Sequence, residues 1–284
     1  MRLLRSTADL MAWRHGVTQS VGFVPTMGNL HEGHLSLLEA ALRDHPVAVL
    51  SIFVNPTQFG PSDDFARYPR TLEQDVAKVE ALLARHPGKE IAIYAPIDTT
   101  EVYPPGFATT IAVPALSSFL EGAIRPGHFE GVATVVYLLF QLVKPRTAYF
   151  GRKDYQQYRV VKRMARDLGL AVHVKGLPIV RSAQGLALSS RNQYLADAEH
   201  LDALLLVRTL KEMKQRLAGS AANADAVRAW ARQVVERDPR WQYLEVREAR
   251  HLGEALPAQG KIVFLGVLKV GAVRLLDNIE GETA

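Results

Sequence analysis

Short apolar runs alternate with amphipathic stretches through the first part of the chain. Apolar runs of strand length lie at 21–24, 47–54, 91–94, 148–150 and 172–175. Most are followed by apolar residues at helical spacing, as at Leu35, Leu38 and Leu42,. Runs that are apolar throughout are typical of parallel strands covered on both faces. This alternation predicts an α/β domain with a parallel sheet.

The pattern changes from about residue 196, which puts a domain boundary near 180–195. The leucines within 201–210 and the segment 222–236 predict two helices,. Strands are predicted at 241–246, 262–268 and 272–276, and the last two would form a hairpin,. Because no parallel β–α alternation remains, we expect an N-terminal domain over 1–185 and a smaller α+β domain over 186–284.

The composition is that of an ordinary globular protein. The chain has 284 residues, of which 48% are hydrophobic and 22% charged,. It shows no apolar stretch long enough to span a bilayer and no signal-peptide core. The absence of cysteine excludes disulfides, thiolate catalysis and cysteine zinc sites,. We therefore expect a cytoplasmic protein that is not bound to a membrane.

The net charge of +5 permits a nucleic-acid partner but also anionic small molecules,. Basic residues are mixed with acids, as in Arg43-Asp44 and Arg166-Asp167, and no run of five or more occurs. This distribution is typical of a solvated surface, so we expect no nucleic-acid partner.

The segment Pro25–His34 follows the first apolar run and begins a helix. Backbone N–H groups at a helix N-terminus attract anions, and Gly28 permits close approach. Gly33 would leave room for a flat ring or a phosphate against the helix. His31 and His34 would share a helix face, where imidazoles suit a phosphoryl group that gains charge. A histidine pair at this spacing also suits a partly exposed helix start or half of a metal site, but its place between a strand and a helix favours nucleotide binding.

Polar residues also follow the second run and close a long connection. Asn55 and Gln58 lie where ligands of open parallel sheets collect, although Asn-Pro also begins turns,. The connection 95–128 is rich in proline and glycine, and long ordered loops are often functional,. It ends in Arg125 and His128, a cation and an imidazole on a turn that equally suits plain solvent exposure.

Two later segments have the composition of phosphate loops. Gly151–Asp154 repeats the order of strand, glycine and helix start, and Lys153 suits a phosphate,. Asp154 and Gln157 fit a plain helix cap equally well. Gly185–Asn192 offers hydroxyls and one guanidinium, which suit either a phosphate-gripping loop or a serine-rich turn,.

Thr71-Leu72-Glu73-Gln74 has the form of a capping box before an amphipathic helix,. Asp75 lies in the first turn of that helix. The helix dipole favours an acid there, and a magnesium ligand is the alternative.

Together, six stretches of the chain resemble the pantothenate synthetase family, also called pantoate–β-alanine ligases. They are PTMGNLHEGH (25–34), SIFVNPTQF (51–59), YPRTLEQD (68–75), RPGHF (125–129), FGRKDYQQ (150–157) and LALSSRNQYL (186–195), with a further match at 275–278. The resemblance implies a homodimer with a Rossmann-like N-terminal domain of the HIGH-type nucleotidyltransferase group. The smaller domain would act as a lid. The implied reaction joins (R)-pantoate to β-alanine through pantoyl adenylate, using ATP and Mg²⁺ and releasing AMP and diphosphate.

Carried over by position, the resemblance assigns residues to ATP, to the substrate pocket and to catalysis. The ATP site would contain Met27, Gly28, Asn29, Leu30, His31, Glu32, Gly33, His34, Gly151, Arg152, Lys153, Asp154, Val180, Leu188, Ser189, Ser190 and Arg191. Gln58 and Gln157 would hold pantoate, and Asn55, Arg125 and His128 would complete the pocket. His34, as proton donor, would act with His31, Lys153 and Arg191, and Asp75 matches a position linked to magnesium. Arg152 stands where the family more often has Glu, which adds positive charge near ATP.

The residue types suit that chemistry. The carboxylate of pantoate is already a nucleophile at neutral pH, so the protein has to align it and neutralise developing charge. Two alternatives stay open. One is another nucleotidyltransferase of the same fold, acting on a phosphate ester. The other is an RNA-binding module that kept a synthetase-like fold.

Overall fold

The computed structural model describes residues 1–60 and 65–284, which form two compact units. The N-terminal unit comprises Met1–Arg152 and Gln157–Pro178, and the C-terminal unit comprises Lys153–Gln156 and Ile179–Ala284. This division follows the internal contacts of the chain, and the functional boundary expected at residue 185 stays a prediction. Among the helices of the described residues, none is both long and apolar enough to traverse a bilayer.

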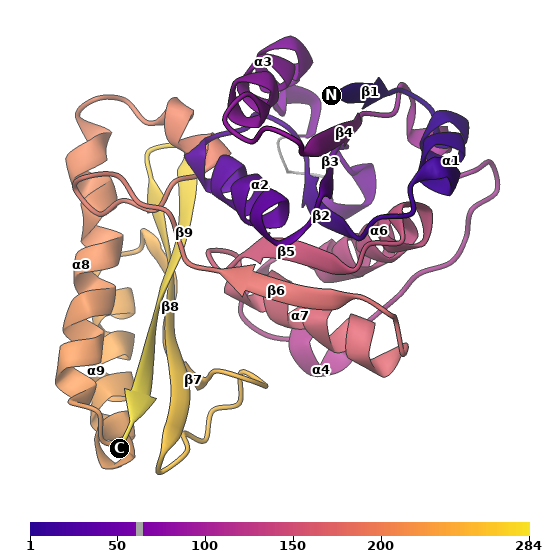
Figure 1. Ribbon diagram of the computed structural model, residues 1–284. Helices are drawn as coiled ribbons and strands as arrows, with labels where there is room; N and C mark the ends of the chain where they lie inside the picture. Colours follow the sequence, from indigo (N-terminus) through magenta and orange to yellow (C-terminus); the bar gives the residue numbers. More distant parts are fainter. Residues whose placement is uncertain (61–64) are drawn as a thin grey trace. The chain divides into compact units, whose positions relative to one another are not determined.

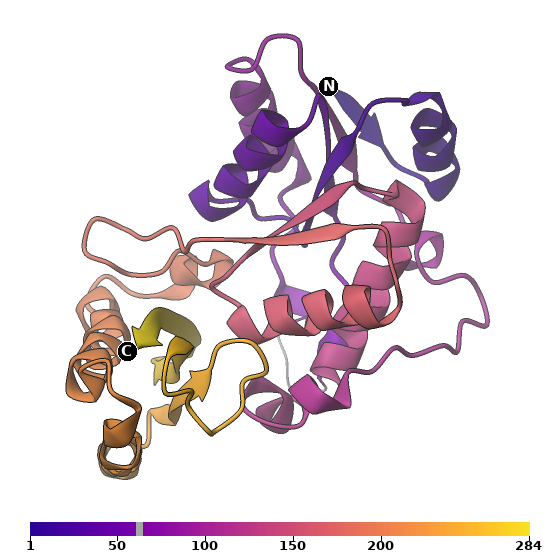
Figure 2. The same cartoon turned by 60° about the horizontal axis from the view of Figure 1, so that its bottom comes forward.

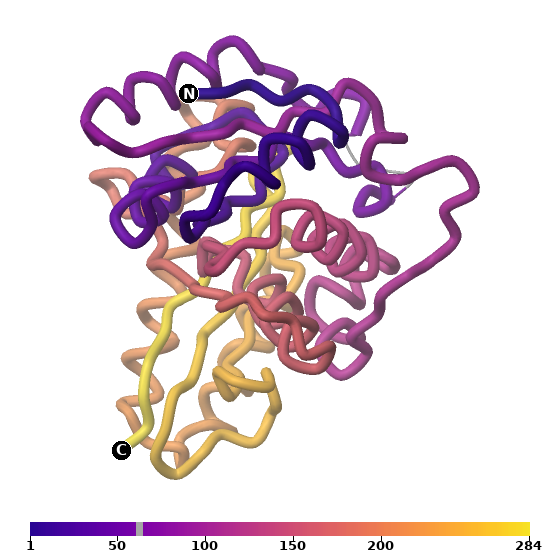
Figure 3. Tube along the Cα trace, turned by 45° about the vertical axis from the view of Figure 1, so that its right-hand side comes forward, coloured from indigo at the N-terminus to yellow at the C-terminus, as the bar shows by residue number. Residues whose placement is uncertain are grey.

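A six-stranded parallel sheet forms the centre of the N-terminal unit (Figure 1). Its order is β1-β4-β3-β2-β5-β6, with bounds β1 Arg2–Leu4, β2 Val21–Thr26, β3 Val47–Ile52, β4 Glu90–Tyr94, β5 Thr147–Gly151 and β6 His173–Leu177. From β2 the chain order runs outward through β3 and β4 on one side and through β5 and β6 on the other. The sheet is therefore doubly wound, with its switch point between β2 and β5. At its edge, β1 runs beside β4 (Figure 3).

Helices lie between the strands of this unit along the chain. Their bounds are α1 Thr7–Gly16, α2 Glu32–Asp44, α3 Leu72–Leu83, α4 Pro114–Ser117, α5 Glu121–Ile124, α6 His128–Val143 and α7 Tyr155–Asp167. Helix α2 packs on β2 and β5 and beside α3, and α6 packs on β2 and beside α1. The central strands are buried on both faces, with Val47 to Leu50 at most 3% exposed. This confirms the interpretation of the apolar runs as covered parallel strands.

Two boundaries differ from the sequence-based expectation. The apolar run 132–143 predicts a helix that begins at residue 132, but α6 begins at His128, because Gly127 supplies a left-handed N-cap at φ +80°,. The apolar pair Ile179-Val180 also suggests an extension of the sheet beyond Pro178, but β6 ends at Leu177 and this pair lies outside the described strands. Pro178 follows the strand directly and has no N–H to donate to a ladder.

The C-terminal unit pairs an antiparallel sheet with two helices (Figure 2). The bounds are α8 Glu199–Leu217, α9 Ala224–Arg237, β7 Trp241–Glu248, β8 Gly260–Val270 and β9 Val273–Thr283. Its core joins Leu210 and Met213 of α8 to Phe264 and Leu268 of β8. The predicted hairpin is confirmed, but its pairing extends to Gly260 opposite Thr283. The expected α/β domain with a smaller α+β domain is thus confirmed.

Candidate functional site

The two glycine-containing junctions leave the sheet from neighbouring strands. β2 and β5 pair in parallel and end at Thr26 and Gly151. Ligands of doubly wound sheets bind beyond the carboxyl ends of strands at this switch point. The fold therefore puts the segments beginning at Met27 and Gly151 where a nucleotide is expected.

Asp75 fastens the loop that follows β2. Its carboxylate accepts the backbone N–H groups of Asn29 and Leu30, at 2.8 and 2.7 Å. It also accepts the Thr71 hydroxyl at 3.1 Å, and the Asp75 side chain is fully buried. Gly28 and Asn29 both adopt positive φ, at +85° and +51°, a backbone conformation that is unfavourable for asparagine,. The hydrogen bonds to the Asp75 carboxylate hold the loop in this conformation,.

These contacts change two expectations. The capping box at Thr71 is wrong, because its hydroxyl bonds the Asp75 carboxylate and makes no cap hydrogen bond to the backbone. A buried carboxylate with three donors is also a poor match for a magnesium ligand, and residues 1–60 and 65–284 contain no group of three or more acidic or histidine side chains suited to a metal. The magnesium role of Asp75 stays a prediction.

His31 and His34 cap helix α2 with their imidazoles. Nδ1 of His31 accepts the Gly33 N–H at 3.0 Å, and Nδ1 of His34 accepts the His31 N–H at 3.4 Å. This is a capping box in which two imidazoles replace the usual hydroxyl and carboxylate. Because each Nδ1 accepts a hydrogen bond, the neutral rings carry their protons on Nε2. Both rings, with centroids 4.1 Å apart, therefore present a donor at Nε2.

The space beside Gly33 is filled by the protein itself. A Cβ at this position would lie 2.7 Å from Cε1 and 2.8 Å from Nδ1 of His31. The flat ring expected against the helix is thus the His31 imidazole, which corrects the interpretation of Gly33 as room for a ligand.

Asn55 follows β3 and is buried, with 1% of its surface exposed, and its side chain makes several hydrogen bonds. Its Nδ2 group donates to Gln58 Oε1 and to Gly131 O, at 3.2 Å each. Its Oδ1 atom accepts the Tyr103 hydroxyl at 2.7 Å and the Thr57 hydroxyl at 3.0 Å. These bonds use both donors and the acceptor of the amide, so the structure places Asn55 to orient Gln58, whereas we expected a direct substrate contact.

Arg125 and His128 hold the main chain of Gln58. Arg125 Nη2 and His128 Nδ1 lie 3.3 and 2.9 Å from the Gln58 carbonyl oxygen. Arg125 Nη1 lies 3.2 Å from His128 Nε2. A guanidinium can only donate, so Nε2 of His128 accepts and its Nδ1–H donates to the carbonyl. The expected pocket residues Asn55, Arg125 and His128 are therefore brought together around Gln58.

The side chain of Gln58 also reaches the loop after β2, since its Nε2 group lies 3.0 Å from the sulfur of Met27. Gln157 is half-buried in the first turn of α7, and its amide makes no hydrogen bond to the part of the chain that the structure describes. Arg152 lies with Cγ 2.9 Å from the position of a Cβ at Gly176, so its stem covers β6. Its contact with ATP stays a prediction.

Sequence reasoning missed Tyr103 and Gly131. A Cβ at position 131 would lie 2.3 Å from the Thr57 carbonyl oxygen, so α6 approaches the turn Pro56–Gln58 this closely only with glycine there,. A glycine inside an otherwise apolar helical run was the available signal for this contact. Tyr103, in the long connection, carried no such signal.

The C-terminal unit carries the remaining predicted residues. The amino group of Lys153 lies 3.3 Å from the Asp154 carboxylate. Leu188 donates its N–H to Val180 O at 3.0 Å, and the Ser189 side chain caps a 3₁₀ turn, Ser190–Tyr194, by accepting the Arg191 N–H. The serine-rich stretch is therefore a capped turn, as the plainer interpretation expected. Its binding role stays a prediction.

The comparisons with known proteins identify the family. A family model described as pantoate-beta-alanine ligase matches residues 2–280. The chain belongs to the pantoate–β-alanine ligase family. Its expected activity, ATP-dependent ligation of pantoate and β-alanine, is thereby confirmed at the level of the family. Among similar curated proteins, the pantothenate synthetase of Roseiflexus sp. (strain RS-1) is 45% identical over 280 residues and that of Chloroflexus aurantiacus (strain ATCC 29366 / DSM 635 / J-10-fl) 44% over 288, with 98% and 99% of both chains covered.

Solved structures of the family have the same fold. The pantothenate synthetase of Thermus thermophilus superposes with a TM-score of 0.86 at 44% identity, covering 98% of this chain and 99% of that one. The pantoate-beta-alanine ligase of Francisella tularensis, complexed with beta-gamma ATP and beta-alanine, superposes with a TM-score of 0.75 at 29% identity and covers 98% and 97%.

Proposed function

We propose that this chain condenses (R)-pantoate with β-alanine through pantoyl adenylate, using ATP and releasing AMP and diphosphate. The observation that carries the proposal is the imidazole-capped start of α2 at the sheet's switch point, beside a glutamine held by four side chains. Family membership and the ATP- and β-alanine-bound relative from Francisella tularensis support it.

Gln58 and Gln157 bind pantoate in this proposal. Amides donate to a carboxylate and pair with hydroxyls, which matches the groups of a hydroxy acid. Within the described residues, Gln58 Nε2 is bonded only to a thioether, a weak acceptor, so a pantoate oxygen can replace Met27 at little cost,. Asn55, Arg125 and His128 act as positioning residues, because their hydrogen bonds fix the side chain and carbonyl of Gln58.

The first step is attack of a pantoate carboxylate oxygen on the α-phosphorus of ATP, with diphosphate leaving. Negative charge grows on the departing group, and preorganised donors lower the barrier most when they face that charge. The Nε2–H groups of His31 and His34, the N-terminus of α2, and the cations Lys153 and Arg191 supply these donors. The other predicted ATP residues shape the nucleotide site; they are Met27, Gly28, Asn29, Leu30, Glu32, Gly33, Gly151, Arg152, Asp154, Val180, Leu188, Ser189 and Ser190.

In the second step the neutral amine of β-alanine attacks the acyl carbon of pantoyl adenylate. The carbon–nitrogen bond of the amide forms as the acyl carbon–oxygen bond breaks, the bridging oxygen leaves with AMP, and the proton lost by the amine passes to the surrounding water. A magnesium ion that accompanies ATP is commonly held by phosphates and few protein ligands. When bound, such an ion would add positive charge at the phosphates, and the residues that the structure describes contain no group of three or more acidic or histidine side chains suited to hold it. We further propose a homodimer, which rests on the family resemblance, and a cytoplasmic location, which rests on the composition of the chain.

The test is product analysis with the purified chain. Pantoate, β-alanine and MgATP should give pantothenate and AMP in equal amounts, and omission of pantoate should abolish AMP release. AMP release with a phosphate ester in place of pantoate would favour the alternative nucleotidyltransferase. His34→Ala and Lys153→Ala should lose about a hundredfold or more in turnover while staying folded. The exposed His200→Ala and Lys211→Ala are matched controls.

A further inference from the structure

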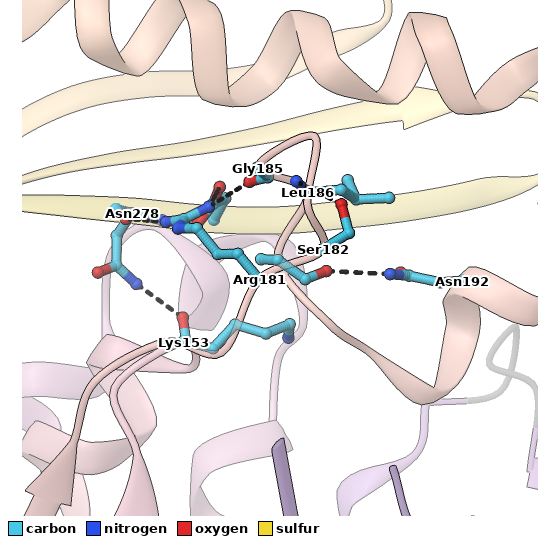
Figure 4. Close-up of polar contacts among 9 residues, drawn as sticks. Lys153, Arg181, Ser182, Gly185, Leu186, Asn192 and Asn278 are labelled. Carbon is cyan, nitrogen blue, oxygen red and sulfur yellow. Dashed lines mark hydrogen bonds and ion pairs between the residues drawn. The ribbon is translucent and has the colours of Figure 1, made fainter. Parts of the chain in front are cut away.

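Arg181 is bonded to strand β9 through both terminal nitrogens of its guanidinium (Figure 4). Nη1 and Nη2 donate to the two carboxylate oxygens of Asp277, at 2.6 and 2.9 Å. The same groups donate to Gly185 O at 3.0 Å and to Asn278 O at 3.1 Å. Asp277 is buried at 2% exposure, whereas the Arg181 side chain is 25% exposed, so this is a bidentate, partly buried ion pair,.

Asn278 connects the same place on β9 to Lys153. Its Nδ2 group donates to the Lys153 carbonyl oxygen at 2.8 Å, and its own N–H donates to Asp277 Oδ1 at 2.7 Å. Asn278 is also 2% exposed. The backbone that carries the Lys153 ammonium is therefore fastened to two adjacent buried residues of one strand.

Arg181 in turn fastens the segment that carries Arg191. Arg181 and Ala187 form an antiparallel bridge, with Ser182 N–H donating to Leu186 O at 2.8 Å. Asn192 Nδ2 donates to Ala187 O at 3.0 Å (Figure 4). The bridged segment therefore leads from the ion pair directly into the turn that begins with Ser189 and Ser190.

We propose that Arg181, Asp277 and Asn278 form a brace, the β9 brace, that positions Lys153 and the Ser189–Arg191 turn for charge neutralisation on the phosphates. All these residues lie in the C-terminal unit. The inference rests on the proposed function, in which Lys153 and Arg191 face the departing diphosphate. The brace residues touch no substrate, so they are positioning residues.

The energetics of the Arg181–Asp277 ion pair indicate that it orients the attached segments more than it stabilises the fold. A buried ion pair gains little net stability, because desolvation of both charges offsets their attraction. Such a pair does fix directions, since the planar guanidinium accepts only a narrow range of partner positions. Lys153 and Arg191 are far apart in the sequence. A shared attachment to β9 would hold both in fixed positions, which they need if both are to bind one triphosphate.

The test is a double-mutant cycle on pantoate-dependent exchange of label between diphosphate and ATP. Asn278→Ala removes the bond to Lys153 O and should lower the exchange rate about fivefold, the scale of one hydrogen bond. Asn223→Ala is the matched control, because Asn223 Nδ2 also donates to a backbone carbonyl of this unit, Leu217 O, at 3.0 Å. This control should keep the wild-type rate.

The decisive comparison adds Lys153→Ala. If Asn278 acts through Lys153, Asn278→Ala has no further effect on exchange in the Lys153→Ala background. A fivefold loss that persists in that background overturns the brace, as does a wild-type rate for Asn278→Ala. A wild-type rate for Lys153→Ala instead overturns the proposed role of Lys153 and the brace with it. Asn278→Ser serves in the same cycle if the alanine variant does not fold.

Discussion

The imidazole of His31 occupies the space that a side chain at position 33 would need. A Cβ on Gly33 would stand 2.7 Å from His31 Cε1, closer than carbon atoms approach without a shift. The ring is thus held against the first turn of α2 by its bond to the Gly33 N–H and by the absence of a side chain there. Position 33 therefore has to be glycine, because the His31 ring of the same motif fills the space that a larger residue would need.

Gly33→Ala should therefore lower turnover much more than it lowers stability. Alanine is the better helix former by about 1 kcal/mol, which offsets part of the cost of moving the ring. Turnover should fall about tenfold or more, because the His31 donor is displaced from its place beside His34. Thermal unfolding and steady-state rates check this. Gly16→Ala, where a Cβ meets nothing within 4 Å, should leave turnover unchanged, and equal turnover in both variants would contradict the account.

Asp75→Asn should destabilise the protein even without metal. The neutral amide is a weaker acceptor for the Asn29 and Leu30 N–H groups, and one of its ends is a donor, so the loss should be about 3 kcal/mol,. Urea unfolding in the presence of EDTA measures it. Unchanged stability in EDTA, together with a raised magnesium requirement in turnover, would instead favour the metal role predicted from the family.

Asn55→Ala should weaken pantoate binding through Gln58. The variant removes the Asn55 hydrogen bonds to Gly131 O, to the Tyr103 hydroxyl and to Gln58 Oε1, so the Gln58 side chain is held less firmly and KM for pantoate should rise about tenfold,. Steady-state kinetics of Asn55→Ala, Gln58→Ala and the double variant provide the check. The two effects should be strongly non-additive. Simple multiplication of the two effects would mean that Asn55 contacts substrate on its own.

His45 makes stability depend on pH. Burial lowers the pKa of its imidazole from 6.5, and Lys175, Lys89 and Arg146 lower it further against an opposing effect of Asp44. Below pH 6.5 the unfolded chain therefore binds a proton that the folded chain rejects, so stability falls as the pH drops towards the folded pKa,.

His45→Gln removes this titration. Between pH 7 and 5, wild-type stability should fall more steeply than that of the variant, by up to about 1.4 kcal/mol per pH unit. Urea unfolding across that range measures both slopes, with the exposed His15→Gln as control. Parallel slopes for wild type and His45→Gln would show that His45 is protonated equally in both states.

The sheet could be predicted because its signal is local. Strands such as 47–52 are apolar almost throughout, and the chain alternates strand and helix, so periodicity alone predicted the N-terminal fold,. Strand β9 was predicted too short because Asp277 and Asn278 interrupt its apolar pattern. Their partners Arg181 and Lys153 lie about a hundred residues away in the chain, and no local pattern reveals such pairs.

In the candidate site, too, local patterns predicted the residues but not the contacts between them. Motif spacing selected Gln58, Arg125 and His128, but it could not show that the last two hold the main chain of the first. It also could not show that His31 fills the space beside Gly33, because that depends on the backbone angle of the cap. The motifs were enough to predict which residues belong to the site. Only the structure shows which of them can contact a ligand and which hold another side chain in place.

The most direct test of the central claim follows oxygen from pantoate to AMP. Pantoate labelled with ¹⁸O in both carboxylate oxygens is turned over with β-alanine and MgATP, and the products are analysed by mass spectrometry. Attack of the carboxylate on the α-phosphorus, followed by cleavage of the acyl carbon–oxygen bond, predicts one labelled oxygen in each AMP and one in each pantothenate. Unlabelled AMP, or ADP with the label in inorganic phosphate, would contradict the pantoyl adenylate route.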